Sequence, residues 1–204
     1  PNPCYDGFYG AGDLMAGRGY TIFDTGLGRC AVAWSEHGIV GILLPESREI
    51  ETRKRVYRLY PDAREMRPTP DIQIAMAGIA TQLRGGEADF SGVRLDLTDV
   101  PGFNQRVYQY VRAIPRGATR TYGEVAADLR ATGAVSSVAQ AIARNPFMIV
   151  VPCHRVLDDG GYPDKMSPNG GVISKRRLLS LEGAYPSRTL FDVLLPVAPP
   201  RPHP

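Results

Sequence analysis

The chain has 204 residues, 43% hydrophobic and 22% charged, which is an ordinary globular composition for one large domain or two small ones. Its apolar runs, such as residues 39–45 and 147–152, are too short to cross a bilayer, and no signal peptide is visible. The odd number of cysteines predicts reduced thiols in a cytoplasmic protein. The net charge of +3 is uneven: residues 1–100 carry 11 Lys/Arg against 14 Asp/Glu, whereas residues 101–183 carry 11 against 6, which favours a polyanionic partner or simply a solvated surface.

The number and spacing of the cysteines argue against disulfide bonds and against a metal site. There are three of them, at Cys4, Cys30 and Cys153, an odd number in a chain too long to need disulfide staples. No CxxC or HxxxH spacing occurs and the histidines are scattered, so we expect no metal site.

The first half of the chain has the pattern of a small sheet with helices. Residues 1–19 form a glycine-rich lead-in, and strands at 20–23, 29–35 and 39–44, separated by short Gly-containing turns, predict an antiparallel meander. Helices are expected over 47–59 and 71–83, followed by an extended stretch over 90–97. No residue of this first unit looks catalytic.

The second half, from about residue 100, has the pattern of short helices. An amphipathic helix is expected over 103–114, and Thr121 with Glu124 forms a capping-box pattern that predicts a helix from 122 to about 129. A further short helix over 135–143 gives a helix-turn-helix pattern, which suggests DNA binding but is shared by many helical pairs. Small side chains dominate this helix, and they allow close approach either to a nucleic-acid backbone or to another helix. A helix over 172–182 and a proline-rich tail complete the chain.

Residues 145–156 carry the clearest chemical signal. An apolar run that is expected to be extended ends at Pro152, which should place the next residues on a rigid turn. Cys153 and His154 follow directly, and a cysteine beside a histidine is a candidate activated nucleophile. The alternative is a buried cysteine next to an incidental histidine, since cysteine is among the most buried residue types.

These residues resemble one family, the O6-alkylguanine-DNA alkyltransferases, also called methylated-DNA–protein-cysteine methyltransferases. The hallmark of that family is a Pro-Cys-His-Arg-Val segment preceded by Asn-Pro, and the resemblance extends over about residues 20–183. The matching blocks are Asn145-Pro146, residues 152–156, residues 113–117, residues 121–126, Gly170-Gly171, Lys175, Leu178-Leu179 and Glu182-Gly183.

The resemblance implies an α+β fold. A small N-terminal antiparallel sheet domain with helices would be followed by a mostly helical C-terminal domain, whose winged-helix-like helix-turn-helix carries the reactive cysteine. The expected division is a lead-in at 1–19, a ribonuclease H-like α/β domain at 20–99, a DNA-binding and alkyl-acceptor domain at 100–185, and the tail at 186–204.

The resemblance also implies a reaction: DNA repair by direct, irreversible transfer of an alkyl group from O6-alkylguanine, and from O4-alkylthymine as a further substrate, to Cys153. The protein would act once, as a monomer on double-stranded DNA, with no cofactor, metal or membrane. Because free cysteine has a pKa of about 8.5, the reaction needs a base. The family's roles fall on His154 as base through a water, Glu182 as its orienting acid, Tyr122 as proton donor, and Asn145 as the link between the helix-turn-helix and the cysteine turn.

Substrate and DNA contacts are implied in the same way. The main-chain carbonyls of Cys153 and Val156 would read the guanine amine and the Asn169 amide would face O6, with Gly170, Met148 and Arg155 completing the substrate set. The nucleotide would have to be flipped out of the duplex. The helix at 135–144 would lie in the minor groove, and the DNA-binding set is Arg130, Ala134, Val135, Ser136, Ser137, Ala139, Gln140 and Arg144.

Two positions depart from the family pattern. Ser136 stands where the family has an arginine that enters the base stack, so base flipping would either be weaker or be supported by Arg130 or Arg144 instead. Pro168 stands where an aromatic residue often packs on the base. These departures leave open a relative that uses its thiol on another alkyl donor, whereas a non-catalytic lesion-binding protein would lack Cys153.

Overall fold

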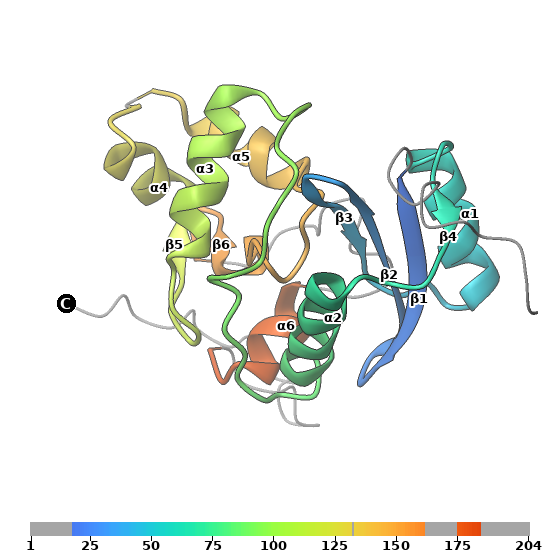
Figure 1. Ribbon diagram of the computed structural model, residues 1–204. Helices are drawn as coiled ribbons and strands as arrows, with labels where there is room; N and C mark the ends of the chain where they lie inside the picture. The colour runs from blue at the N-terminus through green and yellow to red at the C-terminus, as the bar shows by residue number, and fades with distance from the viewer. Residues whose placement is uncertain (1–17, 132, 162–174, 185–204) are drawn as a thin grey trace, which may run out of the picture.

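The structure, a computed structural model, describes residues 18–131, 133–161 and 175–184 and has an α+β architecture (Figure 1). A sheet with two helices is followed by a mostly helical part. The elements are β1 Gly19–Thr25, β2 Gly28–Ser35, β3 Gly38–Leu43, α1 Glu49–Leu59, β4 Arg64–Glu65, α2 Pro70–Gln82, α3 Gly102–Arg112, β5 Arg120–Thr121, α4 Tyr122–Asp128, α5 Val135–Ala143, the 3-10 turn η1 Cys153–Arg155, β6 Val156–Leu157 and α6 Lys175–Leu181.

The sheet has the strand order β3-β2-β1-β4. The first three strands form the predicted antiparallel meander, and the two-residue β4 adds to β1 in parallel. Because side chains alternate along a strand, β2 sends Cys30 and Val32 to one face and Ala31 and Ala33 to the other. Helix α1 covers the second face through Val56, and α2 packs on the first face, which also meets the rest of the chain.

The helices agree with their sequence patterns to within a few residues. Thr121 accepts a hydrogen bond from the Glu124 amide at 3.1 Å while Glu124 accepts one from the Thr121 amide at 2.6 Å, so the capping box is confirmed. The stretch at 90–97, expected to be extended, begins with a turn in which the Val93 amide donates to the Phe90 carbonyl at 3.0 Å, and Leu95 then forms a bridge to Ile39 at the edge of the sheet. Among the helices of the described ranges, none combines the length and apolar character needed to cross a membrane.

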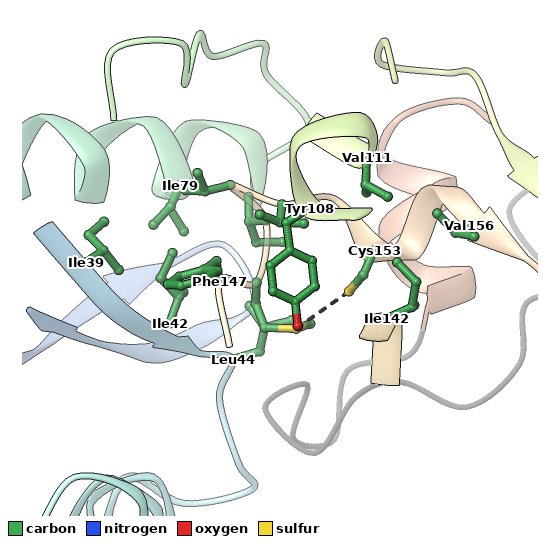
Figure 2. Packing of buried hydrophobic residues seen from close by; sticks show 14 of the residues in the cluster. Ile39, Ile42, Leu44, Ile79, Tyr108, Val111, Ile142, Phe147, Cys153 and Val156 are labelled. Carbon is green, nitrogen blue, oxygen red and sulfur yellow. Dashed lines mark hydrogen bonds between the residues drawn. The ribbon is translucent and has the colours of Figure 1, made fainter. Parts of the chain in front are cut away.

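One hydrophobic core joins the sheet to the helical part. Figure 2 shows Ile39 and Ile42 of β3 packed with Phe147, and the same cluster continues through Tyr108 of α3 to Cys153. The Ile42 amide donates to the Pro146 carbonyl at 2.8 Å, and Ile42 forms a bridge with Phe147. The segment that precedes the cysteine is therefore attached to the free edge of the sheet.

The apolar run at 147–152 is not a strand, and this part of the prediction is wrong. Ile149 has a φ of 74°, a left-handed conformation that is rare for a β-branched residue, and the Val150 amide donates to the Met148 carbonyl at 2.9 Å. This is a γ-turn with positive φ at its central residue, which is a strained arrangement. The Val151 amide closes the turn on the Phe147 carbonyl at 2.8 Å, so the run folds back on itself before Pro152.

Candidate active site

Asn145 holds the turn that leads to the cysteine. Its side chain is fully buried, donates to the Val151 carbonyl at 2.9 Å and accepts from the Phe147 amide at 2.9 Å. Pro152, with φ −77° and ψ 65°, is the centre of an inverse γ-turn in which the Cys153 amide donates to the Val151 carbonyl at 2.8 Å. One buried amide directly after α5 thus sets the backbone that presents Cys153.

His154, which follows Cys153 in the sequence, forms a buried pair with Glu182. The His154 Nε2 lies 2.9 Å from Glu182 Oε1, at the end of α6. Arg155 binds the same carboxylate, with Nε 2.9 Å from Oε2 and Nη2 2.8 Å from Oε1, and its Nη1 donates to the Ile114 carbonyl at 2.5 Å. Burial alone would raise the pKa of Glu182, but the hydrogen bonds from His154 and Arg155 together lower it well below its usual range.

The ionised carboxylate determines which imidazole nitrogen carries the proton. Because a carboxylate only accepts hydrogen bonds, Nε2 of His154 is the protonated nitrogen and Nδ1 has a lone pair. Burial lowers the pKa of His154 against the opposing effect of Glu182, so the ring is neutral at pH 7. Within the described residues Nδ1 is buried and has no hydrogen-bond partner. A buried acceptor of this kind is able to take a proton from a nearby thiol through a water.

The Cys153 sulfur lies in an apolar environment. Cys153 is 0% exposed, and its Sγ lies 3.7 Å from Met148 Sδ. The phenol of Tyr108 donates to the Ala141 carbonyl of α5 at 3.0 Å, and burial raises the pKa of Tyr108 to about 12. A substrate must therefore be brought into the protein to reach the thiol.

Tyr122 and Val156 are held together by Lys175. The parallel pairing of β5 with β6 places the start of α4 beside Val156. The Lys175 ammonium is 1% exposed, donates to Tyr122 Oη at 3.1 Å and to the Val156 carbonyl at 2.9 Å, and lies 5.4 Å from the centre of the Tyr122 ring. The phenol oxygen thus accepts from a cation while its own proton can be donated elsewhere.

The predicted DNA-binding residues lie on and around α5. Its buried face consists of Val138, Ala141 and Ile142. The exposed members of the set are Ser136, Ser137, Gln140, Arg144 and Arg130, and the partly buried ones are Ala134, Val135 and Ala139. The predicted substrate residues Asn169 and Gly170 lie outside the described residues.

Two polar contacts were missed by the sequence interpretation. Lys175 shares a helical stripe with Leu178 and Leu179, and Gln82 of α2 follows Ile79 by three residues; both positions are buried. Gln82 donates to Glu182 Oε1 at 2.9 Å, although no residue of the first unit was expected near the reaction. In the sequence, a polar residue on the apolar face of a helix indicates that its side chain is buried and needs a hydrogen-bond partner.

No group of three or more His, Cys, Asp or Glu side chains within the described part of the chain could hold a metal ion.

Comparison with known proteins agrees with this geometry. A family model described as the DNA-binding domain of 6-O-methylguanine DNA methyltransferase matches residues 102–184. A methylated-DNA–protein-cysteine methyltransferase of Methanothermobacter thermautotrophicus is 38% identical over 156 residues, which are 74% of this chain and 78% of the relative. The chain belongs to the methylated-DNA–protein-cysteine methyltransferase family.

Solved structures of this family share the fold. The O6-methylguanine methyltransferase of Mycobacterium tuberculosis is 29% identical with a TM-score of 0.63, covering 85% of this chain and 98% of that one. A structure of the M. tuberculosis enzyme in complex with DNA is also 29% identical, with a TM-score of 0.61 and coverage of 82% and 95%.

Proposed function

We propose that this protein repairs DNA by direct reversal, moving the alkyl group of O6-alkylguanine in duplex DNA irreversibly onto Cys153. The observation that carries the proposal is the buried His154-Glu182 pair that follows Cys153: a neutral imidazole is oriented by an ionised carboxylate, and its Nδ1 has no hydrogen-bond partner among the described residues. The names of the relatives, and the DNA bound in one of the similar structures, support the substrate class.

In the proposed first step, His154 Nδ1 accepts the Cys153 proton through a water, leaving a thiolate and an imidazolium. Glu182, which accepts the Nε2 proton in a hydrogen bond, stabilises the positive charge that forms on the ring. The thiolate sulfur then attacks the alkyl carbon as the bond from that carbon to O6 breaks, and its electron pair moves into the guanine ring.

The departing guanine takes up a proton in the second step, and Tyr122 is the proposed donor. Lys175 stabilises the phenolate that remains, because its ammonium already donates to Tyr122 Oη. The Val156 carbonyl accepts from Lys175 on one lone pair and has a second one for the guanine amine. Since Cys153, His154 and Glu182 all belong to one chain, a monomer suffices for the reaction.

Base flipping is required because Cys153 is fully buried. We place DNA on the exposed face of α5, where Ser136, Ser137 and Gln140 are small or uncharged enough for the helix to approach a groove closely. Arg130 and Arg144, exposed on either side of α5, are the candidates for phosphate contacts and for filling the space of the flipped base.

The test is to incubate the protein with duplex DNA containing O6-methylguanine and to measure its intact mass. We expect the mass of one methyl group to be added, and no more at excess DNA, with no gain in Cys153→Ser. An unchanged mass with this DNA, together with methylation by a free alkylating donor, would overturn the proposal in favour of a thiol that serves another alkyl donor.

A second arm examines Ser136. Ser136→Arg supplies a side chain that can occupy the base stack, so transfer from duplex DNA should accelerate roughly tenfold, in keeping with the stacking energy of one base. Transfer from the free O6-methylguanine base should not change. Ser137→Arg, one residue along the same helix, is the matched control; equal acceleration in both variants would show a general charge effect and exclude a stacking role at Ser136.

A further inference from the structure

We propose that Gln82, on α2 of the first unit, is a positioning residue for the alkyl transfer: it holds Glu182 where this carboxylate orients His154. The inference rests on the proposed function of Cys153. It assigns part of the thiol-activating arrangement to the half of the chain that carries neither the cysteine nor the DNA-binding helices.

Gln82 occupies a position where an apolar side chain would be expected. Helix α2 buries Ile72, Ala75 and Ile79, and Gln82 lies three residues after Ile79 on the same face, with only 6% of its surface exposed. Burying an amide is unfavourable unless it finds a hydrogen-bond partner. Its partner is Glu182 Oε1, at 2.9 Å and 100 residues away along the chain.

The amide is one of four hydrogen-bond donors to Glu182 among the described residues. Oε1 accepts from His154 Nε2 at 2.9 Å, Arg155 Nη2 at 2.8 Å and Gln82 Nε2 at 2.9 Å, while Oε2 accepts from Arg155 Nε at 2.9 Å. A carboxylate has about four lone-pair sites. Gln82 and His154 share one oxygen, so the position of that oxygen relative to the imidazole depends on both.

The neighbouring backbone ties the same two regions together. Arg116 donates to the carbonyls of Gly85 and Gly86, directly after α2, and to the carbonyl of Leu181, directly before Glu182. Gln82 and Arg155 also line a cleft of about 550 Å³ between the two halves of the chain. Loss of the Gln82 amide would therefore leave Glu182 open to water from that cleft.

Two variants test the role of the amide. Gln82→Leu keeps the approximate shape of the side chain and removes its hydrogen-bond donor. We therefore expect the rate at which the Cys153 thiolate is alkylated to fall about tenfold at every pH, which is the usual effect of losing a hydrogen bond to a charged group. Gln82→Glu provides a donor only while its carboxyl is protonated. Once ionised it faces Glu182 as a like charge, which displaces the carboxylate from His154.

The distinguishing readout is therefore a pH profile. The charged or titratable groups around the position are Glu182, His154, Arg155, Lys175, Arg116 and, in the same cleft, Glu87, Asp89 and Arg112. Because Glu182 is already negative, the new carboxyl should ionise above its ordinary value of about 4.3. The alkylation rate of Cys153 in Gln82→Glu should approach that of the unaltered protein at acid pH. It should fall at least tenfold below the rate of the unaltered protein as pH rises.

The rate is measured as carboxyamidomethylation of Cys153 by iodoacetamide, followed by mass spectrometry of the peptide that contains it. This reagent needs the thiolate but no DNA, so a protein that failed to accept methyl groups from DNA would still give a valid result for Gln82. Partial unfolding would expose Cys153 and speed the reaction, whereas loss of activation slows it.

Gln73→Leu and Gln73→Glu, on the exposed side of the same helix, are the matched controls and should leave the profile unchanged. The proposal is overturned if either Gln82 variant stays within twofold of the unaltered protein at all pH values. It is also overturned if Gln82→Glu follows Gln82→Leu throughout, since shape alone would then explain the loss.

Discussion

At the scale of single residues, His154 is subject to two opposing influences. Burial lowers its pKa, while the Glu182 carboxylate raises it, and burial is the larger effect. The ring is therefore neutral over the pH range in which a surface histidine would already be protonated. A neutral ring is the form that accepts the Cys153 proton in the proposed mechanism.

The pH dependence of methyl transfer follows from this pKa. As pH falls, transfer should be lost only when His154 becomes protonated, so the acid midpoint should lie below the ordinary histidine value of about 6.5. The contribution of His154 to the free energy of unfolding also decreases at acid pH, because the unfolded chain takes up the proton first. This contribution is fully present above about pH 6.5, the pKa of histidine in the unfolded chain, and declines as pH falls towards the lower pKa of the folded protein. Transfer from methylated duplex DNA, measured across this range, gives the midpoint; a value at or above 6.5 would contradict the neutral ring.

The reactive residues could be predicted at this scale, and two of their partners could not. Cys153, His154 and Glu182 stand in a motif that resembles a known family, so a contact between His154 and Glu182 was expected, and it is observed. The contacts of Gln82 and Lys175 depend on how helices from distant parts of the chain meet. Their sequence pattern shows only that a polar residue lies on a buried stripe, and not which group satisfies it.

At the scale of elements, the turn between α5 and η1 shows why local pattern can mislead. Consecutive Ile149, Val150 and Val151 are typical of a buried strand. The buried Asn145 side chain binds the backbone at both Phe147 and Val151, and this closes the chain into a turn that forces φ of Ile149 to 74°. Side-chain to backbone hydrogen bonds competed successfully with strand formation.

Asn145→Ala should therefore destabilise the protein strongly. It would leave the Val151 carbonyl and the Phe147 amide without their partner in a fully buried position, at a cost of roughly 1–3 kcal/mol for each group. We expect the free energy of unfolding, measured in urea, to fall by roughly 2–6 kcal/mol. Gln140→Ala, on the exposed side of α5, should change it by less than about 0.5 kcal/mol; a similar loss in both variants would rule out this role for Asn145.

At the scale of the whole molecule, the expected two units share one hydrophobic core. The meander and the order of helices were predicted from pattern and the α+β class from the family resemblance, and all three are confirmed. The shared core was not, because the amphipathicity of a helix or strand indicates that a face is buried but not what covers it. Phe147, from the second half, lies against Ile42 of the sheet (Figure 2).

Arg116 gives a test of how far the two halves depend on each other. Its guanidinium donates to Gly85 and Gly86 on one side and to Leu181 on the other, at 2.6–2.8 Å. Arg116→Met should reduce the free energy of unfolding by roughly 2–3 kcal/mol, because hydrogen bonds from a charged donor are lost. Arg116→Lys should recover only part of this, since an ammonium cannot reproduce the planar fork.

The matched control is Arg94→Met, which removes an exposed ion pair with Asp71 and should be nearly neutral. An unchanged unfolding midpoint in Arg116→Met would mean that the two halves are held together by the apolar core alone.

The attachment of residues 146–147 to the edge of β3 also has a consequence for biosynthesis. While the chain is being translated, β3 is completed more than 100 residues before Pro146 leaves the ribosome. During that interval the Ile42 amide lacks its partner, and an apolar strand edge is available to other nascent chains. The charged helix α1, which is synthesised next, covers the face of the sheet formed by Ala31 and Ala33 and does not pair with the edge at Ile42. The elongation time from residue 43 to residue 147 thus sets how long this aggregation-prone edge must be protected, for example by a chaperone.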